Sequence, residues 1–433
     1  MCMGMVFAGQ GLSNTPNPED RPAKISLDDA KRYAVTNNFK VKSVSEKVNA
    51  AVASKNRTHS SFYPKFGVAG GLDQYSAGET EEKTSVGYVY GSINLFNGFR
   101  DSYKSEMSAL VEDKFQVELE QEKFRVELDV EEQFHRYLYF KDLITINNDS
   151  LALNQKHQKL VRKTKSMGQA SETDLMEFDL KESIIRSELV SLEQGLETSR
   201  IHLKRLLGEE VGKQIEPVGA LQHQHIKGNL MAYLDQIKTT SIPVKLAAKE
   251  QAISSLKAKS WRSKWLPSVD FEAQAGNLPL DLKLEGIDSR ESSMRLLLVA
   301  KLELFSGMDT YWESRETDHL KNSAASELKH EILMSITEME ESYRKLKAIE
   351  KRVDLELNNV SKSKEYYESV LKEYQRGYKN SADLSGATDR YFEARARQVE
   401  FKFNFLQERL AFERSLGAPL KVEIIQEHKP EKQ

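Results

Sequence analysis

The chain has 433 residues, of which 39% are hydrophobic and 30% are charged, and its formal net charge is −3. This composition is lean for compact cores and typical of long, solvated helices, and the balanced charge excludes the basic surface of a nucleic-acid-binding protein. The single cysteine, Cys2, excludes an intrachain disulfide framework and a cysteine-based metal site. No stretch approaches the roughly 18 consecutive apolar residues of a transmembrane helix, so a membrane crossing would require β-strands in a closed barrel.

The first 25 residues predict a disordered lead-in. Met1 to Gln10 is apolar and lacks a basic beginning, and Val6-Phe7-Ala8 resembles a signal-peptide cleavage site. Two interpretations stay open at this point: the end of a signal peptide, or an ordinary unstructured start.

The strongest signal in the sequence is an internal repeat. Leu95-Phe96-Asn97-Gly98 returns 209 residues later as Leu304-Phe305-Ser306-Gly307. At the same offset Gly168 returns as Gly377, and Leu207-Gly208 returns as Leu416-Gly417. Each copy also contains a 69-residue run without Gly or Pro, although the chain has 22 Gly and 10 Pro. The chain therefore consists of two tandem copies of one repeat, offset by 209 residues.

Each copy predicts two helices followed by a β-hairpin. Ser26 is expected to cap the first helix, with Asp28 and Asp29 in its first turn. After Pro64 and after Pro267 the apolar period changes from helical to alternating. The expected elements are helices at 26–38, 39–62, 229–241 and 243–265, with Pro243 at a first helical position, a loop at 76–83, and strands of about ten residues within hairpins 64–96 and 267–305. Four strands of this length suffice to cross a bilayer but not to close a barrel.

Aromatic residues flank the predicted strands. Trp261 and Trp265 come just before the second hairpin and Trp312 just after it. Aromatic side chains in such places are typical of a membrane-interface girdle. Core packing under a hairpin is the alternative.

The two 69-residue runs predict helices roughly 100 Å long at 1.5 Å per residue. Only one stripe of each is apolar, so each needs neighbours in a coiled-coil-like arrangement. Each is expected to end at a glycine C-cap, Gly168 or Gly377. The next helix of each copy then begins at an equivalent N-cap, Ser171 or Asn380. The first-turn acids are Asp174 and Asp383, at the third helical position.

The order of these motifs, at a constant offset over about residues 26 to 417, resembles the TolC-like outer-membrane efflux proteins. The resemblance implies a homotrimer whose twelve strands close one barrel in the outer membrane, continued by a helical tunnel in the periplasm. It also implies outer-membrane lipid, a periplasmic adaptor (membrane fusion) protein and an inner-membrane transporter of the RND, ABC or MFS type as partners. No cofactor is implied.

The resemblance further implies a constriction at the periplasmic tip. The family's gate positions correspond to Asp174, Tyr374 and Lys379, with Asp383 in a pore-facing ring. Lys379 replaces the more usual Arg, so bidentate pairing is lost, and Gly386 stands where a second acidic ring is found in one family member. The tip turns at Gly168, Ser171, Gly377 and Asn380 are expected to contact the adaptor, and Gly98 and Gly307 to join barrel and tunnel.

The predicted fold class is therefore mainly α with a small β part, built from long antiparallel helical hairpins in two tandem repeats. The predicted divisions are a lead-in 1–25, a first repeat 26–208, a mid-height linker 209–228, a second repeat 229–417 and a tail 418–433. The predicted function is a passive exit duct of an efflux or type I secretion system. The alternative is a coiled-coil scaffold or membrane-surface module without a pore.

An enzyme is not expected. The nine histidines are scattered, and His330-Glu331 lacks the second His of a zinc motif because residue 334 is Met. His223-Gln224-His225 is interpreted as an exposed loop pair rather than a metal site.

Overall fold

The computed structural model describes residues 24–77, 80–167, 170–209, 215–223, 225–226, 228–277 and 293–420. The predicted lead-in (apart from residues 24 and 25), the turn residue Gly168 and most of the C-terminal tail lie outside the described residues. Among the described helices, none has the combination of length and apolar character that a membrane span requires.

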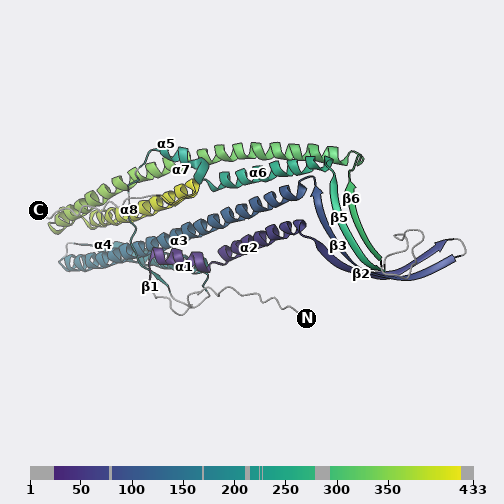
Figure 1. Ribbon diagram of the computed structural model, residues 1–433. Coiled ribbons are helices and arrows are strands. Elements are labelled where there is room, and N and C mark those ends of the chain that lie inside the picture. Colours follow the sequence, from purple (N-terminus) through teal and green to yellow (C-terminus); the bar gives the residue numbers. More distant parts are fainter. Residues whose placement is uncertain are drawn as a thin grey trace. The chain divides into compact units, whose positions relative to one another are not determined.

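The elements follow one another twice in the same order (Figure 1). The first series is β1 (Lys24–Ile25), α1 (Leu27–Asn37), α2 (Phe39–His59), the 3-10 turn η2 (Ser60–Phe62), β2 (Lys65–Ala77), β3 (Thr80–Asn97), α3 (Arg100–Ser166) and α4 (Glu172–Leu206). The second is β4 (Glu216–Pro217), α5 (Leu230–Thr240), α6 (Ile242–Arg262), η3 (Ser263–Trp265), β5 (Ser268–Asn277), β6 (Ser293–Lys301), α7 (Asp309–Gln375) and α8 (Ser381–Leu416). The long helices α3 and α7 both have 67 residues, which confirms the repeat.

The chain forms two compact units, and each takes segments from both repeats. Unit 1 comprises residues 1–37, 129–223 and 352–406, and unit 2 comprises residues 38–128, 224–351 and 407–433. The long helices contribute to both, because each finds a different neighbour along its length. In unit 2 the first part of α3 pairs with α2 through Lys55 and Glu112. In unit 1 its last part receives α4, where the Asn154 side chain donates to the Phe178 carbonyl oxygen.

In unit 1 both repeats share one core. The largest fully buried side chains include Phe134 of α3, Phe178 of α4 and Phe405 of α8. The small parallel ladder of β1 and β4, with Ile25 opposite Pro217, belongs to the same unit. Ion pairs of Lys181 with Asp389 and of Arg395 with Asp149 connect α8 to α4 and α3.

Unit 2 contains a four-stranded antiparallel sheet in the order β2-β3-β5-β6. One face is apolar and exposed, as predicted from the alternation. It carries Phe66, Val68, Leu72, Val89, Met294, Leu296 and Leu298. The other face is polar: Asn94 donates to Asp270 over 2.6 Å, and Tyr90, Gln274 and Arg295 are neighbours across three strands. One face of the sheet is thus suited to apolar surroundings and the other to polar surroundings.

Three details of the sequence prediction were wrong. The first hairpin is longer than expected, because the segment predicted as a loop at 76–83 continues the ladder from Gln74 opposite Lys83 to Ala77 opposite Thr80. Its polar residues suit a strand because backbone pairing needs no apolar face, and Thr favours extended backbone. The last strand ends at Lys301 rather than near Leu304, since its partner β5 begins at Ser268, opposite Lys301. Pro243 is the second residue of α6, not the first.

The glycines that end α4 and α8 make the same close contact in the two repeats. Gly208 has a φ of +71°, and a Cβ there would lie 2.7 Å from the Asn37 carbonyl oxygen at the end of α1. Gly417 has a φ of +72°, and a Cβ would lie 2.7 Å from the Thr240 carbonyl oxygen at the end of α5. Each glycine lets the end of one helix touch the junction between two others.

We expect Gly208→Ala and Gly417→Ala each to destabilise the protein by about 1–3 kcal/mol. Alanine would have to adopt a left-handed backbone conformation, and its Cβ would also clash with a carbonyl oxygen. The measurement is thermal unfolding of the detergent-solubilised protein, followed by circular dichroism. Gly386→Ala is the matched control: Gly386 is helical and a Cβ there has no neighbour within 4 Å, so stability should stay equal or rise. Equal effects at all three positions would contradict the close-contact explanation.

Candidate functional site

The candidate site is the end of unit 1 where α3 turns into α4 and α7 turns into α8. The α7 end is a Schellman turn: Gly377 has a φ of +79°, its N–H donates to the Tyr374 carbonyl, and the Tyr378 N–H donates to the Glu373 carbonyl. This confirms the predicted glycine C-cap at Gly377. The equivalent residue of the first repeat, Gly168, is not among the described residues.

Both predicted N-caps are confirmed. At the start of α4 the Asp174 N–H donates to Ser171 Oγ over 3.1 Å, and the Ser171 N–H donates to Asp174 Oδ2 over 2.8 Å. At the start of α8 the Asp383 N–H donates to Asn380 Oδ1 over 2.8 Å, and the Asn380 N–H donates to Asp383 Oδ2. Two residue types thus build the same reciprocal cap.

The hydrogen bonds from the Ser171 side chain and backbone lower the pKa of Asp174, and a bond from Ser381 lowers it further. Ser381 is buried and also lies 3.4 Å from the hydroxyl of Tyr374. Asp174 of the first repeat and Tyr374 of the second therefore meet at one serine. The sequence analysis assigned no role to Ser381, because nothing local to it indicates a partner 207 residues away.

The predicted gate residues line one open cavity of about 880 Å³. Asp174, Tyr374, Lys379 and Asp383 all contribute to it, together with Gly377 and Asn380. Among the described residues, no carboxylate lies within the 4 Å of an ion pair with Lys379. The Asp174 carboxylate accepts the hydrogen bonds of its own helix cap, from the Ser171 N–H and the Ser171 hydroxyl.

A buried histidine below this cavity escaped the sequence analysis. His157 of α3 is 3% exposed, its Nε2 lies 3.2 Å from the Tyr367 hydroxyl of α7, and its ring contacts Phe178 of α4 edge-on. Burial lowers the pKa of His157 to about 4, so the ring is neutral at neutral pH. His157 stands in a run of polar residues, and only tertiary packing distinguishes it from an exposed side chain.

The two predicted joints have the same backbone shape. Gly98 and Phe99 both have positive φ angles, of 67° and 65°, and Gly307 and Met308 repeat this with 65° and 70°. A Cβ at Gly98 would lie 2.5 Å from the Ser263 carbonyl oxygen of η3, whereas a Cβ at Gly307 would meet nothing within 4 Å. The two joints therefore differ in their surroundings but not in their conformation.

The aromatic residues at the strand ends are largely exposed. Trp265 is 55% and Trp312 is 64% exposed, while the Trp261 ring lies under the Lys264 ammonium group at 3.5 Å from the ring centroid. Exposed tryptophan beside an apolar sheet face is consistent with the predicted interface girdle.

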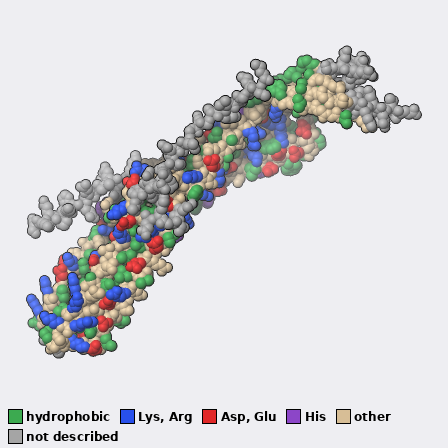
Figure 2. All heavy atoms as spheres, turned by 90° about the horizontal axis from the view of Figure 1, so that it is seen from below, with side chains coloured by type: hydrophobic (Ala, Val, Ile, Leu, Met, Phe, Trp, Pro, Cys, Tyr) green, Lys and Arg blue, Asp and Glu red, His purple; other side chains and the backbone are tan. Residues whose placement is uncertain are grey.

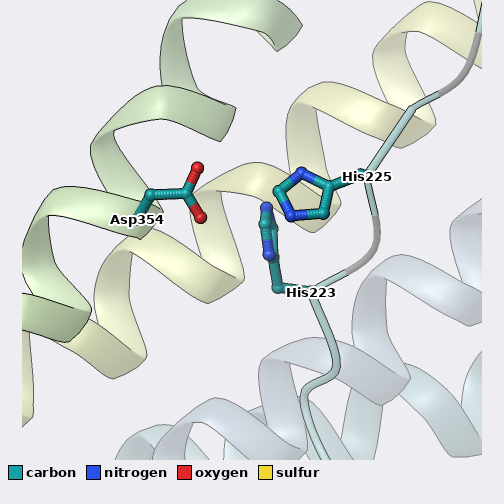
Figure 3. Close-up of side chains that lie close together, drawn as sticks. All are labelled: His223, His225 and Asp354. Atoms are coloured by element: carbon teal, nitrogen blue, oxygen red, sulfur yellow. The ribbon is translucent and has the colours of Figure 1, made fainter. Parts of the chain in front are cut away.

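The histidine pair does not form a site within either unit. His223 and Asp354 belong to unit 1 and His225 to unit 2, and all three side chains are drawn in Figure 3. Within unit 2, His225 Nδ1 lies 3.1 Å from Glu350 Oε1, and Glu350 also accepts the Ile226 N–H. This places His225 in a loop anchored on α7.

Comparison with known proteins relates this architecture to one protein family. Residues 236–418, which are almost all of the second repeat, match the family model described as outer membrane efflux protein. The second repeat belongs to that family. The match confirms the recognition of a TolC-like outer-membrane efflux protein from the order of the motifs, and with it an outer-membrane location and a channel rather than an enzyme.

Solved structures show the same fold over about nine tenths of the chain. The outer-membrane channel OprN is 14% identical, with a TM-score of 0.78, over 93% of this chain and 91% of that one. VceC from Vibrio cholerae is 12% identical, with a TM-score of 0.77, over 91% and 97%. The channel MtrE from Neisseria gonorrhoeae, in its open state, is 12% identical, with a TM-score of 0.78, over 91% and 89%. At these identities the likeness concerns the fold. No curated protein matches the sequence.

The cap at Ser171 yields a prediction. Ser171→Ala should destabilise the start of α4 by about 1 kcal/mol, because one N–H of the first turn loses its acceptor. Hydrogen exchange measured by mass spectrometry should then be faster in peptides covering the first turn of α4. The first turn of α8, capped by Asn380, is the internal control and should be unchanged.

Lowering the pH should also speed hydrogen exchange in the first turn of α4 of the wild-type protein. The lowered pKa of Asp174 means that its stabilising contribution is present above the ordinary carboxyl pKa and is lost as the pH falls through the lowered one. Equal exchange in wild type and Ser171→Ala at neutral pH would contradict the role of this cap.

Proposed function

We propose that this protein is the passive exit duct of a tripartite efflux or type I secretion system. Three copies would close a twelve-stranded barrel in the outer membrane, with the helices continuing into the periplasm. The observation that carries this proposal is the sheet of unit 2, which has one exposed apolar face, one polar face and two edge strands, β2 and β6. A lipid-facing and a water-facing side are what a membrane barrel requires.

Threefold assembly would satisfy the two sheet edges. An exposed edge strand is a template for pairing with another chain, and β6 of one copy meeting β2 of the next would leave no edge. The open surroundings of Gly307 support the same arrangement. Gly98 packs on η3, so the next copy's η2, the repeat equivalent of η3, is a natural neighbour for Gly307.

The surface of α4 in unit 1 supports assembly as well. Met176, Leu180 and Ile184 recur every four residues and are each more than half exposed. Such a stripe lies on one side of the helix, and a neighbouring copy would cover it. The described part of the linker 209–228 is proposed to lie at mid-height.

The proposed partners are a periplasmic adaptor protein at the tip turns around Ser171, Gly377 and Asn380, and through it an inner-membrane transporter. At the tip we propose that Asp174, Tyr374, Lys379 and Asp383 restrict passage. This is supported by their position around one cavity and by the shared contact of Asp174 and Tyr374 with Ser381. Three copies of Asp383 around a pore axis would favour cations.

A matched pair of substitutions in β6 tests the barrel. Leu298 lies on the exposed apolar face, opposite Phe271, and Leu297 lies on the polar face, opposite Glu272. Leu298→Arg should lower the yield of outer-membrane trimer severely, because an arginine facing lipid costs about 2–4 kcal/mol at the bilayer midplane. Leu297→Arg should be tolerated, since Glu272 is its cross-strand partner.

The measurement is the native mass of the detergent-extracted protein, expected at three times the 49.4 kDa chain. A wild-type chain that is monomeric and leaves the membrane fraction without detergent would overturn the proposal. Equal trimer yields for the two variants would show that the apolar face does not meet lipid.

The gate yields a separate prediction. Asp174→Asn should raise single-channel conductance in a planar bilayer, because the neutral side chain weakens the interaction with Ser381 of the other tip turn. Asp179→Asn, five residues further along α4, removes the same charge outside the cavity and should leave conductance unchanged. Unchanged conductance in Asp174→Asn would refute the gate, although the duct itself would stand.

A further inference from the structure

A buried histidine joins the two repeats below the tip cavity of unit 1. His157 of α3 is 3% exposed, and its Nε2 lies 3.2 Å from the Tyr367 hydroxyl of α7. Its ring contacts Phe178 of α4 edge-on, with 5.8 Å between the ring centroids. The imidazole therefore lies among three helices, of which α3 and α4 belong to the first repeat and α7 to the second.

The surroundings of this imidazole favour its neutral form. One ring nitrogen faces Tyr367, and the other, Nδ1, is buried without a hydrogen-bond partner among the described residues. A protonated ring has two N–H donors, so one donor would stay unsatisfied and the charge would lose its hydration. Burial accordingly lowers the pKa of His157 from its ordinary 6.5 to about 4.

The acidic side chains around the ring bind other groups. On α4, Asp179 and Glu182 both accept hydrogen bonds from the Gln158 amide. On α7, the Glu368 side chain is half exposed. Among the described residues, no carboxylate lies within ion-pair distance of His157. A protonated ring would therefore lack a counter-charge.

The remaining charges near the ring are mostly positive. On α3, residues 153–167 contain five cations and no acid. On α4, Lys181 pairs with Asp389 of α8, and on α8 the Arg395 guanidinium lies over the Tyr391 ring. Figure 2 shows Lys and Arg side chains gathered on the surface at this end of unit 1. A proton on the buried ring would add positive charge to a region that is already positive.

Packing contacts connect His157 to the wall of the tip cavity. Tyr367 is buried in one cluster with Leu384 and Ala387 of α8, and Tyr374 packs against this cluster. Tyr374 lies seven residues beyond Tyr367, which is about two helical turns, so both rings lie on the same side of α7. Tyr374 also lines the tip cavity. A movement of α7 at Tyr367 therefore changes the wall of the cavity.

We propose that His157 is an acid-sensitive contact: the neutral ring holds α7 against α3 and α4 through Tyr367, and protonation of the ring releases α7 and widens the tip. The inference rests on the proposed function, in which the tip restricts passage. It adds a residue outside the tip cavity that controls this restriction, and it names the proton as the signal.

The direction of the pH effect follows from the two states of the ring. In the released state the ring is hydrated and binds a proton with its ordinary affinity, whereas the buried ring binds a proton more weakly. The contact therefore has its full stability above pH 6.5 and loses stability as the pH falls towards about 4.

The test records the open probability of single channels of the full-length protein in a planar bilayer, at about pH 7.5 and at about pH 5. The variant is His157→Gln, whose amide can still bond to Tyr367 but does not titrate. The matched control is His135→Gln. His135 is buried on the same helix, and burial together with the charge of Lys31 lowers its pKa to about 4, but its charged neighbours are Glu131 of α3 and Lys31 of α1.

We expect acid to raise the open probability of wild type at least about tenfold, because a shift of this size in one pKa favours the released state by at least that ratio at about pH 5. His157→Gln should respond less than about threefold, and His135→Gln should respond as wild type does. The tip carboxylates are the same in all three proteins, so the comparison isolates the histidine. A full acid response in His157→Gln, or an equal loss of response in both variants, would overturn the proposal.

A second pair of variants keeps the test decisive if His157→Gln does not fold. Tyr367→Phe removes the hydroxyl that faces Nε2 and keeps the ring, so the open probability at about pH 7.5 should rise while the acid response remains. Tyr366→Phe removes an exposed hydroxyl from the next residue of α7 and should have no effect. Equal open probabilities of these two variants at neutral pH would show that the contact does not hold α7.

The native mass of the wild-type protein separates this inference from the proposed function. A conducting trimer without an acid response refutes only the role of His157. A chain that forms neither trimer nor channel refutes the proposed function.

Discussion

The structure depends on one constraint, which is that a 67-residue helix with a single apolar stripe needs cover along its whole length. No neighbour of ordinary length supplies this. The first part of α3 is therefore covered by α2 and its last part by α4, in different units, and α7 is covered by α6 and α8 in the same way. Since each unit draws on both repeats, neither repeat has a complete core without the other.

The glycines that end α4 and α8 follow from the same constraint. A half-length helix has to stop where the next one begins, and the ends must approach closely if the stripe is to stay covered. Gly208 and Gly417 permit contact with the carbonyl groups of Asn37 and Thr240 at these places. In the Schellman turn at Gly377, by contrast, a Cβ would meet no atom within 4 Å. Glycine is needed at this position only because of its left-handed backbone conformation. The space around it is open to other contacts.

At the tip, the carboxylate that caps a helix also belongs to a residue of the proposed gate. The carboxylate of Asp174 completes a helix cap, and Ser381 of the other repeat lies close enough to help lower its pKa. A cap that is shared in this way couples the stability of one turn to the position of the other. The neutral His157, buried between α3, α4 and α7, adds a second link between the repeats without adding a charge.

Periodicity and local chemistry in the sequence were sufficient to predict the repeat, the long helices, both hairpins, the caps at Ser171, Asn380 and Gly377, and the efflux-protein fold. These features depend on residues a few positions apart or on a strict offset, so they can be recognised without knowing the fold. The extension of the first hairpin was missed because a polar ladder has no apolar alternation to mark it.

Only the tertiary structure decided which distant residues meet. Three features follow from how the helices pack: Ser381 lies near Tyr374 and Asp174, His157 faces Tyr367 over a separation of 210 residues, and Lys379 has no ion pair within the described chain. Residues 153–167 contain five cations, but packing determines that four of them face solvent while Asn154, His157 and Gln158 face the core. Burial is a property of the assembled helices, and no local pattern in either repeat contains it.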